Sequence, residues 1–299
     1  MQLRYVRFRA MGCPCEIRFF HRDDAEADRL ADICLTEIRR LETKYSRYLP
    51  GSVTNRINDA AGRDPVMVDQ ETSALLDYAQ TCFDQSEGLF DITSGVLRHL
   101  WHDRLIDTPP LSEFQKWLAV VGWQKVHRTA TSIALPLVGM EIDFGGVVKE
   151  YAADATLELL SQEGIRDCLV NLGGDIAVLG RLSNGQPWEV GITHPELPGQ
   201  VIACIQVGSG AITTSGGYER FISIGDKKFS HLINPVTGIP ADNLQSVTVV
   251  APKAIIAGSI CTISMLHKEA EALDFLNGTN LPFLSVDKQG KCHGSLQGE

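Results

Sequence analysis

The hydrophobic pattern of the first part of the chain predicts two strands followed by a long helix. Residues 3–8 and 15–20 alternate apolar and polar side chains around the turn Gly12-Cys13-Pro14, as paired β-strands do. Between Asp23 and Lys44, apolar residues recur every three or four positions, which is typical of an amphipathic helix. Residues 72–86 and 112–121 show the same helical spacing, and Ser112 is a candidate N-cap of the second of these helices.

Short apolar runs then predict a second half rich in strands. The expected strands are 132–137, 139–144, 167–172, 176–180, 188–192, 201–207, 211–214, 221–224, 246–250 and 283–286. Helices are expected at 148–162, 254–266 and 270–276. Strands and helices do not alternate as in a doubly wound parallel sheet, so the pattern favours an α+β fold with mixed sheets. Because no repeat or long linker interrupts it, we expect a single domain over residues 1–299.

Composition narrows the classes of partner. The chain has 299 residues, 44% of them hydrophobic, which is enough to bury a large core. With 27 Lys and Arg against 37 Asp and Glu, its net charge of −10 disfavours nucleic acids and anionic membranes as partners. No apolar run reaches the length of a membrane span, and the first ten residues lack the apolar stretch of a signal peptide. Unless a leader was removed, we expect a cytoplasmic protein.

The cysteines do not indicate a disulfide framework. Eight are scattered along a chain that has ample apolar residues for a core, so most are expected to be reduced, buried thiols. Cys13 and Cys15 are close in sequence, but they lack the spacing of a CxxC redox centre and the second pair of a zinc site.

Two glycine-rich junctions could hold an anion. At residues 143–149 an expected strand runs into Gly145 and Gly146 and then into a helix that carries Lys149. A helix N-terminus with a nearby lysine favours phosphate, although a tight turn with a solvated lysine would have the same sequence. The second junction, with Gly173 and Gly174 before Asp175, is by itself more typical of an ordinary turn.

A polar segment and a histidine follow. Residues 213–220 contain three hydroxyls, two glycines, Tyr218 and Arg220, a combination that suits phosphate oxygens and a flat ring but also an ordinary polar hairpin. His231 precedes a loop with prolines and a glycine at 234–240. Histidine suits proton transfer near neutral pH, although a lone histidine is more often structural.

Together these segments resemble the ApbE-type FAD:protein FMN transferases. Met11-Gly12 is similar to the family's first turn, residues 46–52 to its S-R-Y-x-P-x-S loop, and residues 90–95 to its F-D-I-T segment. Residues 143–154 are similar to I-D-L-G-G-I-A-K-G-Y-x-x-D. Three later segments follow in the family's order: 173–175, 214–216 and 231–240.

The resemblance implies an α+β fold with FAD in a cleft between two closely packed subdomains, and a metal, usually Mg²⁺, bridging its diphosphate. A Thr or Ser hydroxyl of an acceptor flavoprotein, by resemblance a redox protein, would attack the FMN phosphorus, and AMP would leave. His231 would handle the hydroxyl proton and Lys149 the phosphate charge. The implied cofactor-binding residues are Met11, Ser46, Tyr48, Asp91, Thr93, Asp143, Gly145, Gly146, Lys149, Asp154, Gly173, Gly174, Asp175, Thr214, Ser215, Gly216 and His231. The implied metal ligands are Thr262 and Asp143.

Two positions depart from the family pattern. Residues 257–262 align with A-D-A-x-x-T, but Gly258 stands where the family has a metal-binding aspartate, while Thr262 is retained. Because Mg²⁺ usually takes one or two protein carboxylates, this loss should weaken a metal site. Glu150 replaces the glycine after Lys149. Its carboxylate would either repel a diphosphate or help to hold a cation.

Several hypotheses therefore remain open. In the first hypothesis, the chain transfers FMN with Asp143, Glu150, Asp175 or a substrate carboxylate holding the metal. Alternatively, it binds FAD without catalysis, or it hydrolyses FAD to FMN and AMP. A nucleotide-binding protein that never uses flavin is the hypothesis from an unrelated class.

Overall fold

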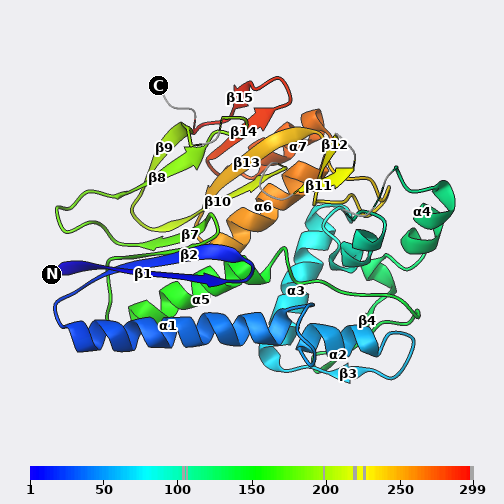
Figure 1. The fold of residues 1–299 in the computed structure, drawn as a ribbon, viewed down its shortest axis with the longest axis horizontal. Coiled ribbons are helices and arrows are strands. Elements are labelled where there is room, and N and C mark those ends of the chain that lie inside the picture. Colours follow the sequence, from blue (N-terminus) through cyan, green and yellow to red (C-terminus); the bar gives the residue numbers. More distant parts are fainter. Residues whose placement is uncertain (103–104, 106, 198, 218–220, 225–226, 297–299) are drawn as a thin grey trace.

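The computed structural model describes residues 1–102, 105, 107–197, 199–217, 221–224 and 227–296, and its largest feature is an eight-stranded sheet (Figure 1). Its strands lie in the order β1 (Gln2–Ala10), β2 (Cys13–His21), β6 (Cys168–Leu172), β7 (Asp175–Leu179), β10 (Gly210–Gly216), β13 (Leu244–Ala251), β14 (Phe283–Asp287) and β15 (Cys292–His293). Mixed sheets were expected, but all strand pairs that the structure describes are antiparallel. Two consecutive helices between β13 and β14 return the chain to the end where β13 finished, which makes this pair antiparallel.

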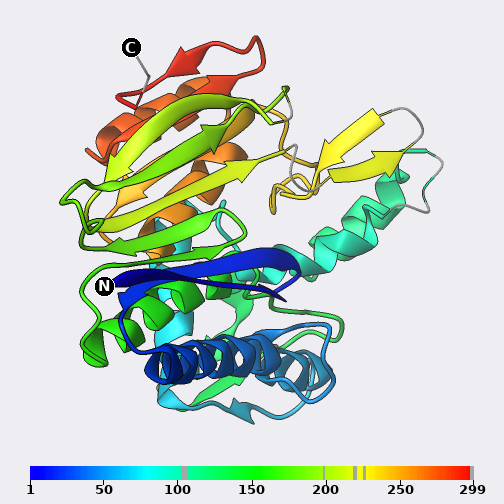
Figure 2. The same cartoon turned by 60° about the vertical axis from the view of Figure 1, so that its left-hand side comes forward.

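Both faces of this sheet are covered. Helices α5 (Val148–Gln162) and α6 (Ala254–Leu266) pack on one face, and α1 (Asp24–Tyr45) packs against α5. The hairpin of β8 (Trp188–Thr193) and β9 (Val201–Val207) covers the other face (Figure 2). Side chains alternate between the two cores along each strand, so that in β7 Ala177 contributes to the helical side and Val178 to the hairpin side.

The remaining elements form a smaller unit beside the sheet. Apart from α7, they are α2 (Val53–Asp59), β3 (Val66–Met67), α3 (Gln70–Gln85), η1 (Ile92–His99), α4 (Leu111–Leu118), η2 (Trp123–Lys125), β4 (His127–Arg128), β5 (Ser132–Ala134), β11 (Phe221–Ile224) and β12 (Lys227–Ser230). Helix α7 (Glu269–Gly278) instead packs on α6 and shares a core with β13 and β14 of the large sheet. A satellite core joins η1, α4 and the β11–β12 hairpin, although these segments are far apart in sequence. Figure 2 shows this hairpin projecting away from the large sheet.

The predicted strand at 139–144 is wrong. Its backbone is occupied by partners outside any strand: the Asn58 side chain accepts a hydrogen bond from Ile142 N–H (2.7 Å) and donates one to Ile142 C=O (3.0 Å). The N–H of Asp143 donates to Ile92 C=O. The Asn58 side chain thus bonds to the backbone groups that would otherwise pair with a neighbouring strand. An apolar run in the sequence does not show which of these partners the backbone has.

Other boundaries shift for local reasons. Helix α2 was not expected because it is only seven residues long, although Ser52 caps it by accepting a hydrogen bond from Asn55 N–H. The 3₁₀ helix η1 was also missed. Helix α4 starts after Pro110 without a side-chain cap, so Ser112 lies within the helix rather than at its N-cap.

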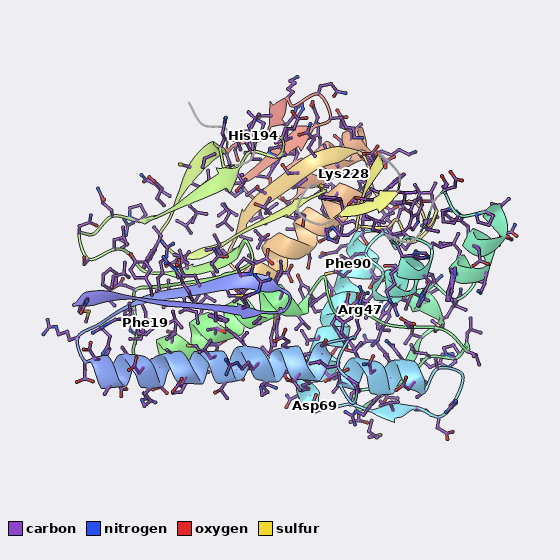
Figure 3. The ribbon with its side chains drawn as sticks, in the orientation of Figure 1. Phe19, Arg47, Asp69, Phe90, His194 and Lys228 are labelled. Carbon is purple, nitrogen blue, oxygen red and sulfur yellow. The ribbon has the colours of Figure 1, made fainter. Side chains whose placement is uncertain are left out.

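Glu71, in the first turn of α3, connects three helices. Arg40 donates to both of its carboxylate oxygens, at 2.6 and 2.8 Å, and Lys44 Nζ lies 2.6 Å away. Tyr151 of α5 donates to the same carboxylate at 3.1 Å. Lys44 also pairs with Asp69, the N-cap of α3, which Figure 3 labels. The hydrogen bonds from Arg40, reinforced by Lys44, lower the pKa of Glu71 to about 2.

This network predicts a pH-dependent loss of stability in Glu71→Gln. Because the carboxyl pKa is lower in the folded state than in the unfolded chain, its contribution is complete above about pH 4.5 and disappears as the pH falls toward 2. After allowance for solvent screening, we expect the variant to lose about 1 kcal/mol of unfolding free energy at pH 7. Thermal unfolding at pH 7 and pH 3 measures the difference, with exposed Glu189→Gln as control. An equal loss at both pH values would contradict this account.

Candidate functional site

The β1–β2 turn holds Met11, a residue of the expected site, and its neighbour Gly12 at positive φ. Met11 has φ 50° and Gly12 has φ 74°, as in the two-residue turns that join twisted antiparallel strands. A positive φ is uncommon for methionine and indicates that the surroundings hold it there. The Met11 N–H donates to Glu42 of α1 at 2.5 Å, which joins the turn to the long helix.

A cleft of about 620 Å³ opens beside this turn. Its walls come from β1, the β2 start, the first turn of α5 and the β6–β7 turn. The lining residues are Arg7, Phe8, Gly12, Cys13, Pro14, Cys15, Glu16, Lys149, Asn171, Gly173 and Gly174. The structure therefore brings Lys149, from the first predicted glycine junction, and both glycines of the second junction to one cavity, whereas Gly145 and Gly146 are not among its lining residues.

Lys149 is fixed at this cleft by an ion pair. Its Nζ lies 2.6 Å from Oδ2 of Asp175, whose side chain is only 4% exposed. Burial alone would lower the pKa of Lys149, but the negative charges of Asp175 and Glu150 outweigh it and raise the pKa. Lys149 therefore keeps its positive charge at neutral pH.

Glu150 is buried against α6, next to Gly258. A Cβ atom added at Gly258 would lie 2.6 Å from Cγ and 2.9 Å from Oε1 of Glu150. Among the described residues, Oε2 of Glu150 finds no hydrogen-bond partner. Burial, and then the charge of nearby Asp175, raise the pKa of Glu150.

The donor atoms at this place fit a hard cation. The carboxylates of Glu150 and Asp175 are buried beside one ammonium group, and Thr262 follows Gly258 by one turn of α6. All are oxygen ligands, which Mg²⁺ prefers. Within the described chain, no three His, Cys, Asp or Glu side chains form a preassembled metal cluster, so water or phosphate oxygens would have to complete the coordination.

Some backbone amides expected to bind phosphate are already occupied. Gly145 N–H donates to the Asp143 side chain at 3.0 Å, and Gly174 N–H to Asn171 at 2.9 Å. Gly173 N–H donates to a backbone carbonyl, that of Pro14. The glycines instead allow close approach, because a Cβ at Gly173 would lie 2.6 Å from Cys13 Sγ. Gly146 precedes α5, which begins without a side-chain cap, although the N–H groups of Val147 and Val148 already donate to Phe144 C=O.

Asp154 sets the position of α6. Its two carboxylate oxygens accept hydrogen bonds from the backbone N–H groups of Ala254 (2.8 Å) and Ile255 (3.0 Å), the first residues of that helix. Burial raises the pKa of Asp154, while these two bonds act in the opposite direction. An α5 side chain thus caps α6, and the two helices that carry Glu150 and Gly258 are held in register.

Asp91 and Thr93 fix the start of η1 to the segment at Gly122 and Trp123. Asp91 caps η1 by accepting hydrogen bonds from the backbone and hydroxyl of Thr93, and it also accepts from Trp123 N–H at 2.9 Å. The Thr93 hydroxyl accepts from Gly122 N–H. Burial raises the pKa of Asp91. Both side chains thus hold η1 in place.

The loop after α1 presents an exposed aromatic ring. Tyr48 is 76% exposed, and Arg47 holds its ring through a hydroxyl hydrogen bond and a cation–π contact at 5.0 Å. Ser46 accepts a hydrogen bond from Tyr48 N–H. Arg47, labelled in Figure 3, also pairs with Asp143. Both Asp143 oxygens are therefore engaged, and coordinating a metal would require Asp143 to exchange one of these partners.

The β10 segment divides its hydroxyls between the two faces of the sheet. Thr213 faces α6, where its hydroxyl lies 3.5 Å from Cys261 Sγ. Thr214 points the other way and shares a hydrogen bond with Thr248 at 2.9 Å. Ser215 lies two positions beyond Thr213 and therefore on the α6 side, ahead of buried Gly216. Tyr218 and Arg220, expected beside them, lie outside the described residues.

His231 follows β12 and is exposed. Its loop is anchored to the satellite core, because Trp101 Nε1 donates to Gly238 C=O at 2.7 Å and the Trp101 ring lies 5.1 Å from that of Phe229. Within the loop, Asn234 accepts hydrogen bonds from two backbone N–H groups. The F-D-I-T segment at the start of η1 therefore supports the same unit that carries His231.

The thiols match their prediction. The described cysteines form no disulfide, and six of them are buried. Cys13 and Cys15 lie 3.8 Å apart at the cleft. The hydrogen-bonded neighbour Cys13, together with burial, raises the pKa of Cys15, so this thiol is not activated.

Comparison with known proteins agrees with this geometry. The ApbE family model matches residues 11–284. The chain belongs to the ApbE family. It is 30% identical to the FAD:protein FMN transferase of Klebsiella pneumoniae (strain 342) over 253 residues, which cover 82% of this chain and 76% of the relative. It is also 30% identical to the enzyme of that name from Treponema pallidum (strain Nichols) over 310 residues, which cover 96% and 85%.

Solved ApbE structures share the fold. The ApbE protein of Thermotoga maritima superposes with a TM-score of 0.89 at 27% identity, covering 100% of both chains. The flavin transferase ApbE of Vibrio cholerae gives a TM-score of 0.88 at 24% identity, covering 98% of this chain and 97% of the other. The family assignment and the α+β class are thus confirmed.

Sequence reasoning missed several residues that shape this ApbE site. Glu42 holds the Met11 turn, Asn171 the Gly174 turn and Asn58 the segment before Asp143. Asn171 lies beside a family motif and bonds to the backbone three residues later, as asparagine commonly does, so it carried a signal. Asn58 carried none, because its backbone partner Ile142 lies far away in sequence. Glu42 carried none, because it is one of many charged residues on a long helix.

The cap on α6 gives the second prediction. We expect Asp154→Ala to lower the free energy of unfolding by about 1–2 kcal/mol, because two backbone N–H groups lose their acceptor. Exposed Glu158→Ala, one turn later on α5, should change it by less than about 0.5 kcal/mol. Urea unfolding measures both variants. If the two variants are equally stable, Asp154 does not position α6.

Proposed function

We propose that this ApbE-family protein transfers FMN from FAD to a Thr or Ser hydroxyl of an acceptor flavoprotein and releases AMP. The proposal is supported by the relatives named FAD:protein FMN transferase, which cover most of this chain. The observation in the structure that carries it is the Lys149–Asp175 ion pair beside a cleft lined by Gly12 and by Gly173 and Gly174 of the β6–β7 turn. An ammonium group held in this way is suited to a diphosphate.

In this reaction the acceptor oxygen forms a bond to the FMN phosphorus. The bond from that phosphorus to the bridging oxygen breaks, and AMP leaves with the electron pair. Catalysis of phosphoryl transfer depends chiefly on alignment and on neutralising the phosphate oxygens. Lys149 provides positive charge in a fixed position because Asp175 restrains its side chain. A divalent cation bound at Glu150 and Asp175 would add to that neutralisation.

His231 is the proposed acceptor of the hydroxyl proton. It lies exposed on a loop held by the satellite core, where an acceptor protein can approach. Imidazole suits this role near neutral pH. Tyr48 is proposed to contact the flavin, because its exposed ring is already oriented by Arg47.

The extent of the domain and the location are also proposals. One hydrophobic core contains residues from Ala10 to Ile263, which supports a single domain over 1–299. No helix in the described ranges has the length and apolarity of a membrane span. The cytoplasmic location and the redox nature of the acceptor stay predictions from the sequence and the family resemblance.

The third prediction tests transfer directly. The protein is incubated with FAD, MgCl₂ and an acceptor with the family's Thr-containing flavinylation motif, and the acceptor is weighed by mass spectrometry. We expect a gain of one FMN, lost when the acceptor Thr is replaced by Ala. His231→Ala should slow the transfer by about 100-fold or more, because the proton acceptor is removed. His194→Ala, a histidine in the β8–β9 connection (Figure 3), is the matched control.

Other outcomes separate the alternative functions. Free FMN and AMP without acceptor modification would identify a hydrolase. FAD that binds but stays intact would identify a non-catalytic flavin protein, and absence of FAD binding would favour a nucleotide protein that does not use flavin. Each of these results would contradict the transferase.

A further inference from the structure

The two positions that depart from the family pattern face each other. Glu150 lies in the first turn of α5, Gly258 lies in α6, and the two helices pack together. A Cβ at Gly258 would come within 2.6 Å of Glu150 Cγ, 2.9 Å of Oε1 and 3.0 Å of Cδ. Because non-bonded heavy atoms do not approach so closely, only glycine at 258 admits Glu150 in this position. Glu150 thus fills the space that a side chain at position 258 would occupy.

The charges around Glu150 do not balance. Glu150 is 7% exposed and Asp175 2%, so both carboxylates are largely removed from water. Lys149 contributes one positive charge, which is paired with Asp175. Oε2 of Glu150 is buried, and no described residue forms a hydrogen bond with it. A buried carboxylate oxygen without a partner is costly, so this arrangement calls for either a proton on Glu150 or a further positive group.

We propose that Glu150 supplies the carboxylate ligand of a divalent cation, in place of the aspartate that the family carries at position 258. The carboxylate ligand thus comes from α5 instead of α6, and it occupies the space beside Gly258. Thr262, four residues after Gly258 and on the same side of α6, offers a hydroxyl, and Asp175 lies beside Glu150. Water or diphosphate oxygens complete the coordination, as is usual for Mg²⁺.

The proposal rests on the proposed transferase function for the FAD diphosphate that completes the coordination of the cation. Cation binding itself can be measured without an acceptor protein. The competing account is that Glu150 carries a proton, shares it with Asp175 and binds no cation. In that case the amide of Gln, which also donates a hydrogen bond, would replace Glu150 without loss of metal affinity. The variant Glu150→Gln therefore distinguishes the two accounts.

The fourth prediction uses Mn²⁺ as the probe. The FAD-bound full-length protein is titrated with Mn²⁺, and free Mn²⁺ is followed by electron paramagnetic resonance. We expect Glu150→Gln, which keeps the shape of the side chain, to weaken Mn²⁺ binding by about tenfold or more. Glu158→Gln, exposed on the same helix, should bind as the parent does. Unchanged affinity in Glu150→Gln would overturn the proposal.

Exchanging the residues at positions 150 and 258 tests whether the carboxylate ligand comes from α5 in place of α6. We expect Gly258→Asp alone to unfold at a lower temperature than the parent, because its side chain meets Glu150. The double variant Glu150→Gly with Gly258→Asp removes that conflict and should recover both thermal stability and Mn²⁺ affinity to within about threefold of the parent. If the double variant folds but binds Mn²⁺ as weakly as Glu150→Gln does, the proposed relocation of the carboxylate ligand is wrong. Mn²⁺ binding through Glu150 without FMN transfer would refute the proposed function and leave the metal site standing.

Discussion

The burial of charged side chains where α5, α6 and the large sheet meet is the constraint on which the site depends. Lys149 and Asp175 stabilise each other at 2.6 Å, and Glu150 lies beside them against Gly258. Charges removed from water must be compensated, so each of these groups restricts its neighbours. The same compensation gives the cleft a fixed positive group where a diphosphate is expected.

Several motif residues act on the framework of the site rather than inside the cleft. Asp154 caps α6, and Asp91 holds η1 to the segment at Trp123. Asp143 fixes the glycine junction through its own backbone contact and through Arg47. Each uses a carboxylate to satisfy backbone or guanidinium groups that would otherwise lack partners. The chemistry of the cleft therefore depends on helix ends and turns that lie around it.

The arrangement also explains how distant segments form one site. The β1–β2 turn, the β6–β7 turn and the start of α5 line the cleft because β2 and β6 are neighbours in the sheet and α5 packs beneath them. The His231 loop comes from a different part, the satellite core around Trp101. An acceptor protein would thus approach through the projecting β11–β12 unit, while FAD would occupy the cleft at the sheet.

The sequence by itself determined the long helices, most strands and the family, because periodic burial and ordered motifs are local properties of the chain. Helices α5 and α6 begin and end where the pattern predicts. It could not exclude a strand at 139–144, since the competing partner, Asn58, lies far away in sequence. Nor could it relate Glu150 to Gly258, which stood as two separate departures from the family pattern. Only the packing of α5 on α6 showed that one substitution fills the space left by the other, because that contact joins positions far apart in the chain.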